Sequence, residues 1–150
     1  MNEKNQGWRL PAIATALAVA ACNGAQSPET QDMAKSSVAV DQGRWDIASI
    51  NGNPPVSGVE SWLEIDLAGG SVTGNAGCNN FFASFKGDLD NLQMGPVGGT
   101  KKMCPGDPMA QEAVVYEILS SATAMRISPT GELVVESSSG EMTAKPAKKG

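Results

Sequence analysis

Residues 74–85, Gly-Asn-Ala-Gly-Cys-Asn-Asn-Phe-Phe-Ala-Ser-Phe, constrain the fold more than any other stretch of this chain. The two glycines suit a β-bulge or a close approach between backbone segments, and the three phenylalanines offer apolar area for a core. Cys78 lies in the middle of the stretch, and Cys104 follows it in the next part of the chain. We therefore expect residues 74–85 to be the structural centre of one small domain.

Residues 10–21 form an uncharged, mostly apolar run that follows the basic residues Lys4 and Arg9. The run is too short to span a bilayer, but it has the length of a signal-peptide core. It ends in Val-Ala-Ala followed by Cys22, which resembles the bacterial lipobox, in which the signal is removed before a lipidated cysteine. We predict residues 1–21 as a lipoprotein signal peptide and Cys22 as the lipidation site. An ordinary signal peptide, with Cys22 incidental, is the alternative.

A lipidated Cys22 would fix where the protein resides. One acyl chain gives marginal membrane binding, whereas two or more hold a protein firmly. Asn23 follows Cys22, where many inner-membrane lipoproteins have Asp, so we predict an outer-membrane anchor facing the periplasm. Residues 22–42 are rich in Ser, Gln, Ala, Asp and Glu without apolar periodicity, which predicts a disordered tether. We expect the folded domain at residues 43–144 and a basic tail at residues 145–150.

With Cys22 assigned to the lipid, Cys78 and Cys104 remain as an isolated pair. In an exported protein such a pair is expected to form a disulfide. Two packed free thiols, or thiolates with metal or redox chemistry, are the alternatives. Met94, Met103 and Met109 are soft donors near Cys104 that would suit Cu(I), but methionine more often fills cores. We therefore predict no metal and no cofactor.

Short strands dominate the predicted secondary structure. Residues 45–50 start a first strand, residues 62–67 alternate apolar and acidic side chains, and Gly69-Gly70 predicts a hairpin turn into residues 71–74. A weak strand is predicted over residues 89–94, and further strands at residues 124–128, 132–136 and 141–144. This order predicts a small α+β domain, a curled antiparallel sheet with one amphipathic helix packed on it.

The helix is predicted to follow Asp107 as its cap, with Pro108 in the first helical position. Helical spacing places an apolar set on one face and a polar set on the others. The apolar set is Val114, Val115, Ile118, Leu119 and Ala122, and the polar set is Glu112, Glu117 and Ser120.

Charge and residue usage exclude several functions. The net charge is −5, with 11 basic and 16 acidic residues dispersed along the chain, so nucleic acid is not an expected partner. The sequence has no histidine, which removes the commonest general base and zinc ligand. Glu64 and Asp66 share one face of a strand, where solvent exposure explains them. We predict no catalytic residues and no enzyme.

Asn79 and Asn80 lie beside phenylalanines, and amides next to rings could contact a carbohydrate or a peptide. Alternatively, the rings fill the core and the amides satisfy backbone groups at a tight turn. The second interpretation is favoured, and the two asparagines are kept as possible interaction residues.

Four segments together resemble a known family. They are Trp-Asp-Ile-Ala-Ser-Ile-Asn-Gly at 45–52, Gly-Cys-Asn-Asn-Phe at 77–81, Thr-Lys-Lys-Met-Cys at 100–104 and Gly-Glu-Leu at 131–133. With the acid-bearing helix between them, they resemble the META domain of HslJ-like envelope proteins. The resemblance implies the fold, an envelope setting and a link to stress tolerance, with no known catalytic activity or ligand. Lys101 replaces the arginine that usually follows Thr100, and Lys102 replaces a commonly apolar residue.

The expected function is therefore that of a non-enzymatic, lipid-anchored protein that binds or stabilises an envelope component. Its predicted contacts are the membrane, through the lipid, and an envelope protein or ligand, with Thr100, Lys101 and Lys102 as possible interaction residues. The alternative is an inhibitor of a lysozyme or protease that acts through the loop at residues 95–108.

Overall fold

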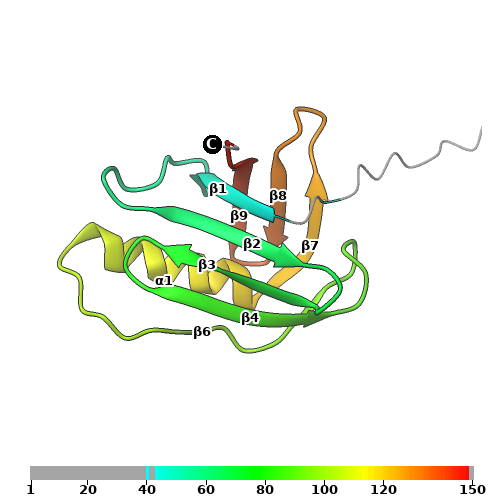
Figure 1. Ribbon diagram of the computed structural model, residues 1–150, viewed down its shortest axis with the longest axis horizontal. Helices are drawn as coiled ribbons and strands as arrows, with labels where there is room; N and C mark the ends of the chain where they lie inside the picture. The colour runs from blue at the N-terminus through cyan, green and yellow to red at the C-terminus, as the bar shows by residue number, and fades with distance from the viewer. Residues whose placement is uncertain (1–39, 41–42, 149–150) are drawn as a thin grey trace, which may run out of the picture. The chain divides into compact units, whose positions relative to one another are not determined.

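Nine strands and one helix make up the part of the chain that this computed structural model describes, which is residue 40 and residues 43–148 (Figure 1). In chain order they are β1 (Gly43–Ile50), β2 (Ser61–Asp66), β3 (Ser71–Ala76), β4 (Asn80–Lys86), β5 (Gln93–Met94), β6 (Gly98–Gly99), α1 (Asp107–Ser120), β7 (Ala122–Ile127), β8 (Leu133–Ser137) and β9 (Gly140–Pro146).

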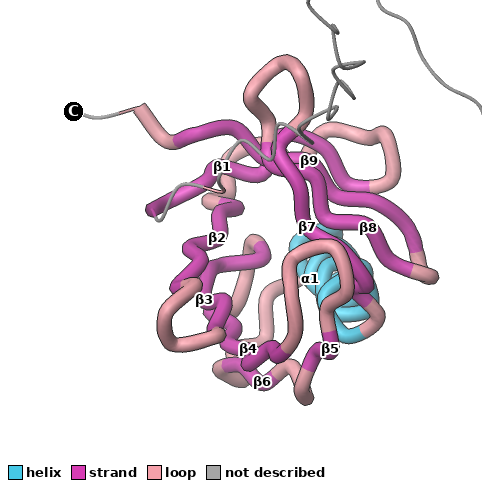
Figure 2. The backbone as a smooth tube through the Cα atoms, turned by 90° about the vertical axis from the view of Figure 1, so that its right-hand side faces the viewer, coloured by secondary structure: helices cyan, strands magenta, loops and turns pink. Residues whose placement is uncertain are grey.

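The strands form one antiparallel sheet with the order β5-β4-β3-β2-β1-β9-β8-β7, and the short β6 also pairs with β4. Backbone hydrogen bonds join the two ends of this order. The N–H of Leu92 donates to the Thr123 carbonyl (2.8 Å), and the N–H of Met125 donates to the Leu89 carbonyl (2.7 Å). The sheet is therefore curled almost into a barrel, as Figure 2 shows. The predicted α+β fold with a curled antiparallel sheet and one helix is confirmed.

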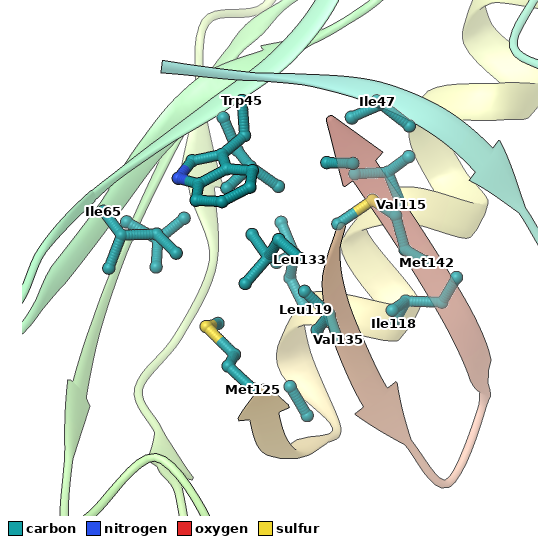
Figure 3. Close-up of a cluster of buried hydrophobic side chains, with 14 of the residues drawn as sticks. Trp45, Ile47, Ile65, Val115, Ile118, Leu119, Met125, Leu133, Val135 and Met142 are labelled. Atoms are coloured by element: carbon teal, nitrogen blue, oxygen red, sulfur yellow. The ribbon is translucent and has the colours of Figure 1, made fainter. Parts of the chain in front are cut away.

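The core lies between the curled sheet and α1, which contacts β3, β8 and β9. Figure 3 shows part of it, with apolar side chains from α1 and from five strands that point toward one another. The labelled members are Trp45, Ile47, Ile65, Val115, Ile118, Leu119, Met125, Leu133, Val135 and Met142.

The strands predicted from alternation are present. In β2, Leu63 and Ile65 are buried, whereas Glu64 and Asp66 are exposed. The hairpin through Gly69-Gly70 pairs β2 with β3 in antiparallel register. The alternation of apolar and acidic residues in this segment therefore corresponds to one buried face and one solvent-exposed face of the strand.

Several boundaries differ from the prediction. The weak strand predicted over residues 89–94 is reduced to β5, because Leu89 and Leu92 form backbone hydrogen bonds with β7 instead. β9 continues through the first two residues of the predicted tail, since Lys145 pairs with Asp46 and Pro146 with Trp45. Val40, within the predicted tether, is buried in the core.

The helix also differs from the prediction. Gly106, with φ of 75°, occupies the cap position without a side-chain cap hydrogen bond, and Asp107 is the first helical residue. Ala122 belongs to β7, and Val114 is half-buried. Glu112, predicted on a polar face, is buried.

The predicted signal peptide, Cys22, most of the predicted tether and the last two residues of the predicted tail lie outside the described residues.

Candidate functional site

A disulfide joins the turn between β3 and β4 to the segment that leads into α1. Cys78 and Cys104 are bonded with an S–S distance of 2.04 Å and a Cα–Cα distance of 6.0 Å. The bond ties residues 100–104, which we call the clamped segment, to residues 74–85. The backbone entering α1 is thus held at a fixed point before the helix begins.

Asn79 holds the same segment through its side chain, which is 1% exposed. Its Oδ1 accepts hydrogen bonds from Thr100 Oγ1 and from the backbone N–H of Lys102, both at 2.7 Å. Its Nδ2 donates to the Lys102 carbonyl (3.1 Å) and to Glu112 Oε1 (3.0 Å). The Asn79 amide is therefore used inside the protein, in agreement with the interpretation that it satisfies backbone groups, and a partner cannot reach it.

Glu112 completes this network from α1. Its Oε2 accepts the backbone N–H of Asn79 at 2.8 Å, so both carboxylate oxygens bond to one residue. Gln111 makes an equivalent connection, because its Nε2 donates to the Ala76 carbonyl (2.7 Å) and its Oε1 accepts the N–H of Val56 (2.6 Å). Two adjacent polar side chains of α1 thus fix the two backbone segments that face them.

Sequence reasoning missed both of these residues. The helical spacing contained a signal for one of them, since Gln111 lies four residues before Val115 and seven before Ile118, on the buried face. Glu112 carries a charge, and charged residues are seldom buried unless they are paired. Its partner is 33 positions away in sequence, which no local pattern shows.

A groove of about 500 Å³ lies between β6 and α1. It is lined by Val97, Gly99 and Thr100, from β6 and its flanks, and by Met109, Glu112 and Tyr116 of α1. Figure 1 shows β6 running below α1 on its way to the start of the helix. The groove combines apolar side chains with a few polar atoms, the composition that binding sites usually have.

Tyr116 contributes a buried hydroxyl that has no hydrogen-bond partner. The hydroxyl lies so close to Gly99 that a Cβ at this position would collide with it, and the ring contacts Phe81 edge-on with centroids 6.2 Å apart. Burial raises the pKa of Tyr116 above its ordinary value of 10.0, and the Glu112 carboxylate raises it further. Tyr116 is therefore neutral at physiological pH and can donate one hydrogen bond.

The clamped segment presents its other side chains to solvent. Met103 is 90% exposed, and Lys101 and Lys102 are exposed beside it; all three line the groove. Met103 therefore does not fill the core, which corrects the role expected of it, whereas Met94 does pack against the core. Among the described residues, no group of three or more His, Cys, Asp or Glu side chains is placed to hold a metal ion.

Phe82 is the second exposed large apolar side chain among the described residues, at 61%. Phe81 and Phe85 point into the core, whereas Phe82 lies on the other face of β4 over Gly98. Asn80 is exposed on that same face, where its Oδ1 accepts a hydrogen bond from an adjacent asparagine. Of the two predicted asparagines, Asn80 is the one that a partner can reach.

The model of the META domain family matches residues 38–149. The chain belongs to the META domain family. Among solved structures, this META domain protein is similar to an NMR structure of a protein from Burkholderia xenovorans, with 18% identity and a TM-score of 0.55. That similarity covers 73% of this chain and 84% of the other, and it shows a shared fold. No curated protein matches.

Membership supports an envelope-associated protein, and the META domain family is not a known enzyme family. The helix described in the structure is neither long nor apolar enough to cross a membrane.

Proposed function

We propose that this META domain protein is a non-enzymatic, lipid-anchored protein of the cell envelope, whose domain binds another envelope component through the clamped segment. The observation that carries the proposal is the exposure of Met103 between two fixed points. The disulfide holds Cys104 on one side, and the Asn79 side chain holds Thr100 and Lys102 on the other.

Rigidity and exposure together favour binding. A segment that is already ordered loses little conformational entropy when a partner docks on it. An exposed large apolar side chain next to cationic ones offers both burial and charge to such a partner. The clamped segment meets these conditions with Met103, Lys101 and Lys102.

The non-enzymatic part of the proposal rests on the chemistry available. The sequence has no histidine, and Cys78 and Cys104 are bonded to each other. Glu64 and Asp66 lie exposed on the face of β2 opposite its buried residues. Glu112 is buried beside the groove, but both of its oxygens accept hydrogen bonds from Asn79.

Lipidation of Cys22 would place the domain at the periplasmic face of the outer membrane. The support is the lipobox-like sequence before Cys22 and the residue Asn23 after it. A link to stress tolerance follows from the family resemblance. Metabolic labelling with palmitate tests the anchor: the wild-type protein should incorporate the label, and Cys22→Ser should lose both label and membrane association.

Site-specific photo-crosslinking in intact cells tests the binding role. A photoreactive residue at Met103 should give one crosslinked product of defined mass. The same residue at Ser138, exposed in the turn between β8 and β9, is the control and should give none. A Met103 variant that is present, folded and without crosslinks under envelope stress would contradict the proposed function.

A second candidate is inhibition of a lysozyme or protease through the loop at residues 95–108. It is favoured by the disulfide that stiffens this loop, since inhibitors present rigid, exposed segments. Tight inhibition that is abolished by replacing Lys101 and Lys102 would support it, and inactivity against lysozymes and proteases would remove it.

A further inference from the structure

We propose that the groove between β6 and α1 binds an extended, acidic peptide segment of the partner protein, which adds as a strand to the free edge of β6. This inference rests on the proposed binding role and specifies what is bound. Four observations lead to it: an unpaired strand edge, an unsatisfied hydroxyl, two lysines and the size of the groove.

β6 offers an open edge. Among the described residues it pairs with β4 alone. The N–H of Thr100 donates to the Asn80 carbonyl at 3.0 Å, so Thr100 faces β4. Because bonded residues alternate along an antiparallel strand, the N–H and C=O of Gly99 point away from β4, and Gly99 lines the groove. An unpaired edge of this kind is a template on which another strand can pair.

Tyr116 lies directly beside this edge, with its buried, unpartnered hydroxyl packed against Gly99. A buried donor without an acceptor is unfavourable, and a ligand that supplies the acceptor removes the penalty. The backbone of a peptide paired with Gly99 carries carbonyl oxygens within the same groove. An extended peptide therefore satisfies the strand edge and the Tyr116 hydroxyl at the same time.

The charges of the groove favour an acidic peptide. Glu112 is its one acidic lining residue, and the backbone N–H and Nδ2 of Asn79 already bond to it. Lys101 and Lys102 line the groove with exposed side chains. The site is therefore cationic on a chain whose net charge is −5, and carboxylates on the peptide would pair with the two lysines.

The size of the groove suits a few residues of peptide. Its volume of about 500 Å³ is within the range of ligand sites in proteins. Val97 and Met109 supply apolar contacts for alternate side chains of the added strand. The disulfide and the Asn79 network keep the adjoining clamped segment in place before binding, which reduces the entropy lost.

The test selects binding peptides from a displayed library of random sequences, with the full-length protein in nonionic detergent as the target. The peptides are about eight residues long, roughly four times the length of the two-residue β6. We expect the recovered peptides to be enriched in Asp and Glu and depleted in Pro, which cannot complete a strand pairing. Binding of the tightest peptide should slow the hydrogen exchange of the Gly99 amide at least about tenfold, because that N–H becomes hydrogen-bonded.

Two variants examine the named contacts. Tyr116→Phe removes a hydroxyl that has no partner in the free protein, so its melting temperature should not fall, while peptide affinity should drop about fivefold. Lys101→Glu with Lys102→Glu should weaken binding at least about tenfold. The matched control is Lys86→Glu with Lys148→Glu, which makes the same charge change at two exposed lysines outside the groove.

Several results would overturn the inference. They are the recovery of no peptide, recovery without acidic enrichment, a Gly99 amide that exchanges unchanged, or a Tyr116→Phe variant that binds as the wild type does. If the Gly99 amide is protected from hydrogen exchange without peptide, and the protection increases with protein concentration, the edge of β6 pairs with a second copy of this chain. Protection by phosphatidylglycerol vesicles alone would assign it to a membrane. If crosslinking at Met103 persists in any of these cases, the proposed function stands and the peptide is rejected.

Discussion

Asn79→Ala is expected to destabilise the domain far more than the same change at its neighbour Asn80. The Asn79 side chain makes four hydrogen bonds to nitrogen and oxygen atoms, at 2.7, 2.7, 3.0 and 3.1 Å. The three hydrogen bonds with uncharged partners are each worth about 1 kcal/mol, and the hydrogen bond to the Glu112 carboxylate is worth about 2 kcal/mol. Water can only partly replace the three bonds to Thr100 and Lys102, which are exposed residues, so we expect a net loss of about 3 kcal/mol, less than the full total of about 5 kcal/mol.

Asn80→Ala is the matched control, because it deletes the same atoms one position away. Asn80 is exposed, and its side chain accepts one hydrogen bond, from Asn75 Nδ2 at 2.8 Å. We expect a change of about 0.5 kcal/mol or less. The difference in the free energy of unfolding between the two variants therefore measures the effect of the buried hydrogen-bond network, because both variants lose the same amide group.

Urea unfolding followed by tryptophan fluorescence is the appropriate assay, with the disulfide kept oxidised. A loss of about 3 kcal/mol would lower the unfolding midpoint by roughly 2 M if the denaturant slope is near 1.5 kcal/mol per molar. A loss below about 1 kcal/mol, or one equal to that of Asn80→Ala, would refute the network. A double-mutant cycle with Thr100→Val then isolates the 2.7 Å bond, for which we expect a coupling of about 1 kcal/mol.

Three further predictions concern other parts of the structure. Tyr116 is the single tyrosine, so the absorbance of tyrosinate reports its pKa directly, and the midpoint should lie above 10.0. The free energy of unfolding should fall as pH rises from about 10 toward that midpoint, and this fall should be absent in Tyr116→Phe. A midpoint at or below the ordinary value would contradict the burial. Replacing Cys78 and Cys104 by serine should cost about 3 kcal/mol in urea unfolding, because the loop spans 26 positions; a loss under about 1 kcal/mol would contradict this. Gly74→Ala should destabilise the domain by about 2 kcal/mol or more, because the added Cβ would lie 2.6 Å from the Phe81 ring. An unchanged melting curve would show that this close approach is absent.

The sequence predicted those elements whose stability is visible in local pattern. β2 alternates because one of its faces is buried, and the turn after it needs the conformational freedom of Gly70, whose φ is 61°. β5 and β6 have two residues each, too few to carry a periodic signal. They are strands because β4 pairs with them, so their existence depends on the tertiary structure.

The candidate site was predicted in part. The sequence singled out Asn79 and Thr100, which the structure brings together, but it left open whether a partner or the protein itself uses them. Glu112 was expected at the surface, because an isolated buried carboxylate is very unfavourable. It is buried because Asn79 supplies two donors, and that pairing exists only after β4 and α1 have met. The Tyr116 hydroxyl gave no sequence signal at all.

The clamped segment contributes no side chain to the hydrophobic core, yet two separate devices hold it. A disulfide alone would fix Cys104 and leave the preceding residues free, and the Asn79 network alone would fix Thr100 and Lys102 without the connection to α1. Together they keep Met103 exposed in one position, whereas a loose loop could fold that side chain back onto the protein. Because core packing does not need this rigidity, the natural interpretation is that it serves the surface, where the edge of β6 is open and the buried hydroxyl of Tyr116 beside it also lacks a partner.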